Sequence, residues 1–378
     1  RQSSLLNYHS INFHVKISSK INENEWNDNL AKSSASTVYQ TYNWQKLYHE
    51  AFGSKPIFIT ITTNDGNVVG QLACLIHEKM LWEDANFVSK KIGNAFKLAT
   101  SLWWYQGPII HDRDNRNEIL SIILSSVDKI AKENKVVTIR GISPPLTDQF
   151  PTKTFQKFGY NSEPRLTFII DLNQNLDDLY NSLKKDTRYY IRKSEREGFE
   201  FEISKDMEGL IKLQDLKIDA KKREGKTPIL DREFYKTHWK IMHHDGFEEV
   251  LIAKDNGEIK GTILTLFFNG NMIQHALANS PTKDLIGTFL TWNTIKWAQK
   301  MKFHTFDFAG VDPSPKTEKE KGIYFYAAKF GGKKVDLFSY TKIIDRKKYY
   351  LSLILKNPRL MVSKYHSYKQ KKIRKKDD

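Results

Sequence analysis

Hydrophobic and polar residues alternate along two stretches of the chain, and each stretch runs into a turn signal. The stretch 57–62 leads to Asp65-Gly66, and the stretch 250–253 leads to Asn256-Gly257; a second alternating stretch follows each turn. Alternation with a period of two is typical of strands, and Asp-Gly or Asn-Gly between such strands is a strong short-range signal for a hairpin. The pattern therefore predicts two β-hairpins of similar design.

The order of elements after each hairpin is also shared. The first half is expected to continue with a helix at about 116–134, a strand at 136–139 and a Phe-Gly segment at 155–160. The second half is expected to continue with strands at 272–278 and 305–308, a helix at about 286–301 and a Phe-Gly-Gly segment at 326–332. This echo predicts an α+β fold of two units, each an antiparallel sheet completed by a crossover helix and a parallel strand.

The same patterns set the expected boundaries of the parts. We expect an N-terminal extension at 1–35, a first unit at 36–165, a second unit at 166–345 and a basic helical tail at 346–378. A strand at 165–171 and a single helix at about 176–197, ended by Gly198, connect the two units. Two more helices, at about 206–223 and 232–243, precede the second hairpin, and the first unit carries an additional segment near 79–99.

Composition excludes several classes of protein. The chain has 378 residues, of which 39% are hydrophobic, and this suits globular domains better than a disordered chain. Cys74 is the single cysteine, and no cluster of Cys and His has the spacing of a zinc site, so we expect neither a disulfide nor a metal. No stretch has the roughly 20 apolar residues of a membrane span, and the N-terminal residues lack the apolar core of a signal peptide. These features predict a cytoplasmic protein.

Positive charge is concentrated in two segments. The net charge is +16, and residues 342–378 contribute +10 of it, with 13 Lys or Arg and three Asp. The expected linking helix carries six basic and two acidic residues between positions 184 and 196. A solvated polar face is one interpretation of this helix. The other is an anion site, because Arg188 and Arg192 lie one turn apart and can hold a phosphate or carboxylate between them.

Several short motifs resemble those of one family. The basic segment 183–199 with its Gly stop is similar to a helix of the FemAB-type aminoacyltransferases, and Phe306-Asp-Phe-Ala-Gly310 followed by Phe330-Gly-Gly332 resembles that family's Phe-Asp-x-x-Gly and terminal signature. Tyr39-Gln-Thr-x-x-Trp44 and Gly107-Pro108 extend the resemblance over about 38–340. The resemblance implies two tandem GNAT-like domains. It also implies transfer of an aminoacyl or acyl group to an amine of a cell-envelope or polysaccharide precursor.

The resemblance also suggests residues for the chemistry. Asp307 is expected either to orient the acceptor amine or to cap the loop that follows it. The lysine that relatives carry three residues before the Phe of Phe-Gly-Gly is Ala327 here, and Lys329 lies two residues along, a rotation of about 200° on a helix. We assign catalysis to Asp307 and Lys329, although the alanine is also compatible with altered activity. Substrate binding is assigned to Arg188, Arg192, Tyr105, Trp44, Tyr324 and Tyr326.

The partners expected from this assignment are anionic. Aminoacyl-tRNA is the implied donor, a nucleotide-linked or lipid-linked precursor is the implied acceptor, and no bound cofactor is expected. The basic tail, with its apolar clusters, is expected to contact the inner face of the membrane. An acyl-CoA-dependent N-acetyltransferase is the alternative enzyme; it is disfavoured because the segment 281–289 has one glycine and no Gly-x-Gly. A non-catalytic binder of nucleic acid or membrane surfaces is the alternative of another class.

Overall fold

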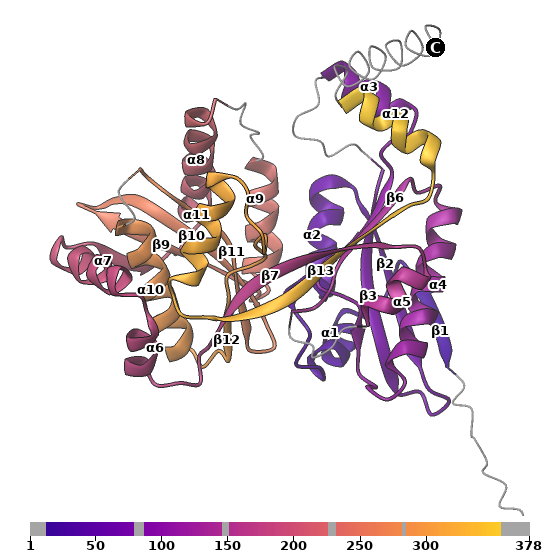
Figure 1. Cartoon of the computed structure of the whole chain (residues 1–378), viewed down its shortest axis with the longest axis horizontal. Coiled ribbons are helices and arrows are strands. Elements are labelled where there is room, and N and C mark those ends of the chain that lie inside the picture. Colours follow the sequence, from indigo (N-terminus) through magenta and orange to yellow (C-terminus); the bar gives the residue numbers. More distant parts are fainter. Residues whose placement is uncertain (1–12, 79–86, 146–150, 226–231, 282–284, 357–378) are drawn as a thin grey trace, which may run out of the picture.

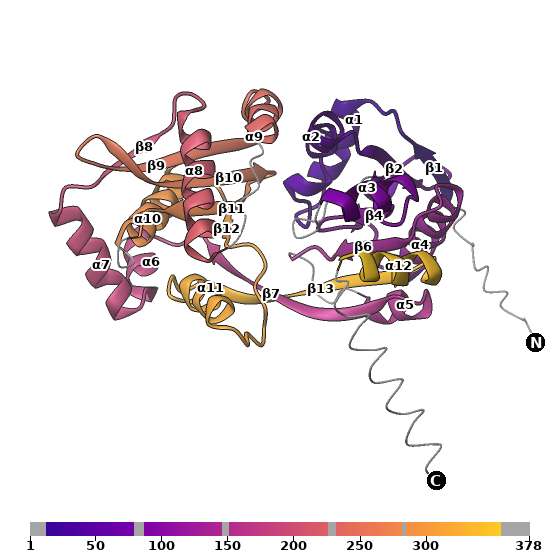
Figure 2. The same ribbon diagram turned by 90° about the horizontal axis from the view of Figure 1, so that it is seen from above.

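The computed structural model describes residues 13–78, 87–145, 151–225, 232–281 and 285–356, which form two lobes joined by a shared sheet (Figures 1 and 2). The strands in chain order are β1 (His14–Ser18), β2 (Lys55–Thr62), β3 (Val68–His77), β4 (Ser101–Trp104), β5 (Ile109–Ile110), β6 (Thr138–Ile142), β7 (Asn161–Asp171), β8 (Glu200–Ile203), β9 (Glu248–Asp255), β10 (Glu258–Phe268), β11 (Asn271–Asn279), β12 (Thr305–Asp307) and β13 (Lys333–Ile343). They pair in the order β1-β2-β3-β4-β6-β13-β7-β12-β11-β10-β9-β8, and β5 pairs with β3 beside this path.

The first lobe has the predicted hairpin and crossover. Strands β2 and β3 form the hairpin, and β4 and β6 run parallel on either side of helix α4 (Arg116–Glu133) in the sequence. One face of α4 buries an apolar stripe against the sheet, with α5 (Thr152–Lys157) beside it. Helix α1 (Glu23–Ala31), the short 3-10 helix η1 (Val38–Gln40) and helix α2 (Tyr42–Phe52) complete the lobe.

The second lobe repeats this build. Strands β9 and β10 form the second hairpin, β11 and β12 are parallel, and α10 (Leu285–Lys300) connects them. Helices α8 (Glu208–Arg223), α9 (Arg232–His238) and α11 (Glu318–Ala328) surround the sheet. Both copies of the repeated pattern therefore have the predicted elements, and the tandem arrangement is confirmed.

Strands β7 and β13 belong to both lobes at once. The first half of β13 pairs with β7, and its second half also pairs with β6, so Ser339 lies between Glu163 and Ile142. The far end of β7 pairs with β12 in the second lobe. Figure 1 shows the two long strands crossing from one lobe to the other. Each lobe thus depends on a strand that runs into it from the other. The expected unit limit at 165 cuts through β7, and β13, inside the expected second unit, also pairs with β6 of the first.

One predicted helix is wrong in its continuity. The stretch 176–197 forms two helices, α6 (Leu176–Ser182) and α7 (Lys185–Arg196), because Leu183 and Lys184 have extended backbone with ψ near 147° and 152°. Leu183 turns into the core, and the Lys184 N–H donates to the carbonyl of Lys329. Tertiary contacts at these two residues outweigh a helical periodicity that continues through them.

The segments outside the two expected units also contribute structure. From the N-terminal extension, β1 adds to the edge of the first sheet and α1 packs on β2 and β3 through Trp26 and Leu30. Helix α3 (Phe87–Ala95) lies in the additional segment of the first unit and packs against α12 (Arg346–Lys356), the described part of the tail. Residues 357–378 lie outside the described residues. Helix α9 continues as a π-helical turn, η2 (Trp239–His243).

Candidate functional site

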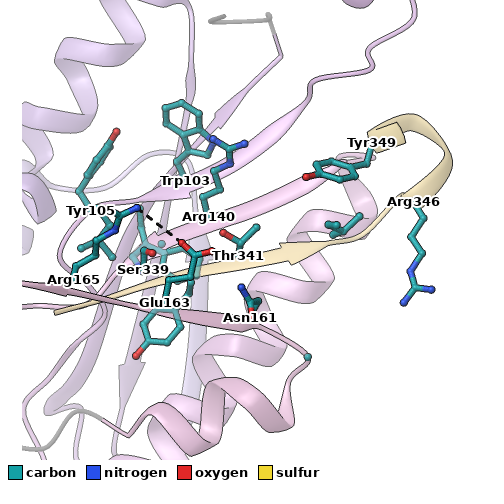
Figure 3. A pocket seen from close by; sticks show the side chains of 16 residues that line it. Trp103, Tyr105, Arg140, Asn161, Glu163, Arg165, Ser339, Thr341, Arg346 and Tyr349 are labelled. Atoms are coloured by element: carbon teal, nitrogen blue, oxygen red, sulfur yellow. Dashed lines mark ion pairs between the residues drawn. The ribbon is translucent and has the colours of Figure 1, made fainter. Parts of the chain in front are cut away.

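An open groove of about 730 Å³ lies on the first lobe (Figure 3). Its floor is one face of the adjacent strands β4, β6, β13 and β7, and its end is the first turn of α12. Its labelled lining side chains are Trp103, Tyr105, Arg140, Asn161, Glu163, Arg165, Ser339, Thr341, Arg346 and Tyr349.

Strand register creates this floor. Trp103, Arg140, Thr341 and Asn161 are consecutive cross-strand partners, and their side chains therefore share one face of the sheet. Their neighbours in sequence, such as Trp104 and Tyr340, point to the other face and pack against the helices of the first lobe. The groove is thus the polar face of a sheet whose opposite face is core.

The charge of the groove is positive. Arg140, Arg165 and Arg346 line it against one carboxylate, Glu163. Arg140 lies over the Trp103 ring, 5.8 Å from its centroid, and Arg165 lies 3.7 Å from Asp312 and 4.0 Å from Glu163. These ion pairs are long and solvent-exposed, so they weakly restrain the arginines. The groove can therefore receive an anionic group, with aromatic rings beside it.

A buried carboxyl of the second lobe contacts the same strand, β7, beyond the groove. Arg165 and Thr167 share a face of β7, and the Thr167 hydroxyl donates to the Asp307 carboxylate. The Ala309 N–H donates to the same carboxylate at 2.8 Å. Burial raises the pKa of Asp307 to about 6, and the hydrogen bonds from Thr167 and Ala309 oppose the rise. Asp307 therefore caps the loop after β12, which is one of its two expected roles; its role in orienting an amine stays a prediction.

The sheet of the second lobe opens next to Asp307. Strands β11 and β12 pair over three residues, after which β12 ends and β11 continues to Asn279. Gln274 and His275 line the opening on β11, where a bulge leaves His275 out of register with β10. Gln274 faces Thr291 of α10, at 3.4 Å between side-chain oxygens, whereas His275 faces the first lobe. Gln274 and His275 therefore face opposite sides of the sheet beyond the end of β12.

Aromatic residues of the first lobe pack against His275 on the side of β11 that faces away from α10. The Tyr39 hydroxyl and Nδ1 of His275 lie 3.1 Å apart, and the Trp44 ring packs edge-on against His275. Burial, together with His238 and Lys217, lowers the pKa of His275 to about 3, so this imidazole is neutral near pH 7. Burial and the neighbouring Asp307 raise the pKa of Tyr39. The lobes thus meet through neutral hydrogen-bonding groups.

The motif at 39–44 has a structural explanation. The buried Gln40 side chain accepts from the Ala73 N–H at 2.9 Å and donates to the Tyr105 carbonyl at 2.6 Å. Thr41 caps α2, and Trp44 is 1% exposed within the junction core. The expected contact of Trp44 with a substrate is therefore corrected to a packing role. Tyr105, in contrast, lines the groove and lies 5.7 Å from Tyr39, ring to ring.

Lys329 lies on the α10 side of the second sheet, opposite the side on which His275 faces the first lobe. It caps the C-terminus of α11, and its Nζ donates to the Thr288 hydroxyl of α10 at 2.8 Å while lying 4.5 Å from the Tyr326 ring centroid. The Tyr326 hydroxyl donates to the Gly287 carbonyl at 2.9 Å. Ala327 is buried in the core. Lys329 puts its ammonium group at the first turns of α10, and its catalytic role stays a prediction.

The remaining predicted residues are spread over the second lobe. Arg188 donates to the Asn181 carbonyl at 2.8 Å, and Arg192 is exposed on the same helix. Helix α7 lies at the far edge of the lobe from the groove, so the structure does not bring these arginines to it (Figures 1 and 2). Tyr324 is half-buried against Phe168. The groove, with Tyr105, and the region of Tyr326 and Lys329 are separate places.

Sequence reasoning missed the groove arginines. Arg140 stands between apolar residues of β6, and Arg165 stands in the otherwise apolar second half of β7. A charged residue within a short apolar strand is a signal that could have drawn attention to each. Their convergence depends on the pairing of β6, β13 and β7, which no local pattern specifies.

Metal ions and coenzymes need grouped ligands or free helix N-termini. Within the part of the chain that the structure describes, no three His, Cys, Asp or Glu side chains are grouped as metal ligands. At the start of α4, the Asp112 carboxylate accepts from the N–H groups of Asp114 and Asn115. This position, where a helix N-terminus could bind a pyrophosphate, is occupied by a carboxylate of the chain itself. None of the described helices is long and apolar enough to cross a membrane.

Parts of the sequence are similar to known proteins. A family model described as an acetyltransferase (GNAT) domain matches residues 181–320. The lipid II:glycine glycyltransferase of Staphylococcus aureus is 27% identical over 175 residues, which cover 42% of this chain and 40% of that protein. The chain thus spans about two-fifths of the length of the curated relatives that it matches.

Solved structures share the fold. FemX superposes with a TM-score of 0.70 at 17% identity, over 89% of this chain and 99% of that chain. A tandem GNAT protein from the clavulanic acid biosynthesis pathway superposes with a TM-score of 0.55 at 12% identity, over 87% and 98%. The fold is therefore GNAT-like, and residues 181–320 are similar to a GNAT family model. The sequence similarity to the glycyltransferase agrees with the resemblance to FemAB-type aminoacyltransferases that the motifs indicated.

Proposed function

We propose that the protein is a FemAB-type N-acyltransferase that transfers an aminoacyl group to an amine of a phosphate-bearing cell-envelope precursor. The observation that carries the proposal is the arginine-lined groove on β4, β6, β13 and β7, together with the buried Asp307 carboxyl that Thr167 of β7 contacts. The related glycyltransferase is named for lipid II, a lipid-linked acceptor, and this supports an acceptor of that class.

The groove is suited to the acceptor. Arg140, Arg165 and Arg346 supply positive charge for the phosphates, and Trp103 and Tyr105 offer ring faces to a sugar or base. The distal amine of the acceptor would then extend along β7 toward Asp307. A nucleotide-linked and a lipid-linked precursor share the phosphate that this arrangement recognises.

The donor is best accommodated on the α10 and α11 side. The N-terminus of α7 contacts the carbonyl of Lys329 through Lys184 and Thr187, so a strongly basic helix begins next to that lysine. Arg188, Arg192 and the other cations of α7 would contact the phosphates of a tRNA acceptor arm. Tyr326 and Lys329 would lie near its aminoacyl end.

The reaction needs positioning more than a strong base. The neutral amine nitrogen attacks the ester carbonyl, a C–N bond forms, and the C–O bond to the tRNA hydroxyl breaks as that oxygen regains a proton from the amine. Holding both reactants at the opening of the sheet lowers the entropic part of the barrier. An ammonium group such as that of Lys329 would stabilise the developing oxyanion.

Two alternatives remain as arms of the test. An acyl-CoA donor is the first, since the GNAT family model is compatible with acyl-CoA as well as with an aminoacyl donor. A non-catalytic binder is the second, and similarity to a transferase does not favour it.

We also propose that the protein works in the cytoplasm, with peripheral contact to the membrane through the tail.

The deciding experiment is a turnover assay with a panel of donors. Purified protein is incubated with a nucleotide-linked peptidoglycan precursor and either aminoacyl-tRNAs or acyl-CoAs, and the acceptor is analysed by mass spectrometry. We expect a product with aminoacyl-tRNA. A product with acyl-CoA alone would overturn the donor assignment. Salt-sensitive binding without any product would overturn the proposal that the protein is an enzyme.

A paired variant tests the groove. Arg140→Gln with Arg165→Gln should weaken acceptor binding about tenfold to a hundredfold and reduce its salt dependence, because two charge-assisted contacts are lost. Lys132→Gln with Lys157→Gln is the matched control, since these exposed lysines lie on α4 and α5, on the opposite face of the sheet. Equal binding by both variants would exclude the groove as the acceptor site.

A further inference from the structure

Helices α3 and α12 form a projecting pair on the first lobe (Figures 1 and 2). Ser352 of α12 is buried, whereas several large apolar side chains around it are exposed. Phe96, just after α3, is 67% exposed and Tyr350 of α12 is 58% exposed. Ile92 of α3 and Leu351 and Leu353 of α12 are also exposed. We refer to these five side chains as the α3–α12 surface.

This surface holds a third of the exposed large apolar side chains in the described part of the chain, namely five of fifteen. Scattered exposed apolar residues are normal, but a cluster on two adjacent helices indicates a contact surface. Aromatic and aliphatic side chains together on a surface helix are typical of segments that enter the interfacial region of a bilayer.

Positive charge surrounds the same surface. Helix α12 begins with Arg346, Lys347 and Lys348, and from residue 346 onward the chain has 12 Lys or Arg and two Asp. Cations at a helix N-terminus oppose the helix dipole, and a negatively charged surface nearby offsets that cost. On α3, Lys91 is exposed as well. Exposed apolar side chains on two helices that also carry cations match the chemistry of an anionic bilayer better than that of a second copy of this basic chain.

The surface is connected to the groove through α12. Arg346 and Tyr349 line the end of the groove, while Tyr350, Leu351 and Leu353 of the next turn form part of the surface. Docking of this helix on a membrane would therefore bring the groove to the level of the lipid headgroups.

We infer that the α3–α12 surface binds an anionic lipid bilayer and holds the groove at the membrane. The inference deepens the proposed peripheral membrane contact by naming the surface that makes it, and its consequence for acceptor use rests on the proposed function. Membrane binding itself needs no catalysis, so the two can fail separately.

Sedimentation with vesicles tests the binding. The full chain is mixed with phosphatidylcholine vesicles with or without phosphatidylglycerol, and the surface variant carries Ile92→Ser, Phe96→Ser, Tyr350→Ser and Leu351→Ser. A control variant carries Ile17→Ser, Ile203→Ser, Ile211→Ser and Met301→Ser, four exposed apolar residues on other elements. Circular dichroism and thermal unfolding verify that both variants are folded.

We expect the full chain to sediment with phosphatidylglycerol-containing vesicles and the surface variant to bind them at least about tenfold more weakly, with the control unchanged. Equal sedimentation of the two variants would overturn the inference. It would also be overturned if the full chain stayed in solution while a chain ending at residue 356 sedimented, because residues 357–378 would then be what covers the surface. A dimer in solution that the surface variant abolishes, without a change in vesicle binding, would assign the surface to a second copy instead.

Turnover separates this inference from the proposed function. The surface variant should lose activity on a lipid-linked acceptor in vesicles and keep activity on a soluble nucleotide-linked acceptor, since none of its four residues lines the groove. Vesicle binding without turnover on either acceptor would contradict the proposed function but not the inference that the α3–α12 surface binds membranes. Equal loss on both acceptors would contradict the membrane role in catalysis.

Discussion

Asp307 is a buried carboxyl whose ionised form is held by two donors, and its effect on stability has a definite sign. The pKa of the folded carboxyl is about 6, against an ordinary value of 3.8, because burial disfavours the charge. Between these pH values the folded chain retains a proton that the unfolded chain has released. Stability therefore falls as pH rises through this window and levels off above the folded pKa.

The prediction concerns Asp307→Asn. From pH 5 to pH 7 the native protein should lose about 1 kcal/mol of unfolding free energy relative to this variant, because the variant has no proton to release. Urea unfolding at several pH values measures the difference. Asp336→Asn on β13 is the control, since that carboxyl is exposed. Parallel pH profiles for native protein and Asp307→Asn would contradict the burial argument.

Lys329 gives the second prediction at this scale. Lys329→Gln keeps the hydrogen bond to Thr288 possible but removes the charge near the first turns of α10. If the ammonium stabilises the oxyanion, kcat should fall about a hundredfold while KM for the acceptor changes little. Steady-state kinetics measure the split, with Lys300→Gln at the exposed end of α10 as the control. A higher KM with unchanged kcat would assign Lys329 to binding.

At the scale of elements, Gly141 of β6 leaves room for the ring of its β4 partner, Trp104. A Cβ at this position would lie 1.9 Å from the Trp104 ring. The ring cannot move aside, because it is buried and its N–H donates to the Gly107 carbonyl at 3.0 Å.

Gly141→Ala should therefore destabilise the protein by about 1–3 kcal/mol or more, as overpacking of a rigid core does. Gly322→Ala is the control: it lies in α11 with no atom within 4 Å of the added Cβ, and it should be neutral or slightly stabilising. Thermal unfolding of both variants measures the effect. A Gly141→Ala variant as stable as the native chain would show that Trp104 has room to move.

Elements formed by local patterns were predictable from sequence, and those formed by distant pairing were not. The hairpins and helices α4 and α10 follow from turn signals and periodicity within each segment. The break at Leu183 depends on the core and on the Lys329 carbonyl, which lies far along the chain. The groove was missed for the same reason, since Arg140 and Arg165 come together only when β13 is inserted between β6 and β7.

At the scale of the whole molecule, β7 and β13 bind the two lobes into one sheet. Gly331 permits the turn into β13 with φ of 81°, and a Cβ there would lie 2.9 Å from the Ser182 carbonyl oxygen. From this turn β13 runs along β7 and then along β6, so unfolding of the second lobe removes a strand from the first. Buried Tyr39 and Trp44, packed on Ile273, add a common core.

We therefore predict that the lobes unfold together, although chains of this length often unfold in stages. Hydrogen exchange of α4 in the first lobe and of α10 in the second should give the same midpoint in denaturant. Gly141→Ala, whose direct effect is confined to β4 and β6, should lower both midpoints equally, because loss of the first sheet releases β13. In the contrary outcome, α4 loses protection at lower denaturant while α10 keeps its native midpoint. The second lobe would then be stable without the strand pairing that it shares with the first.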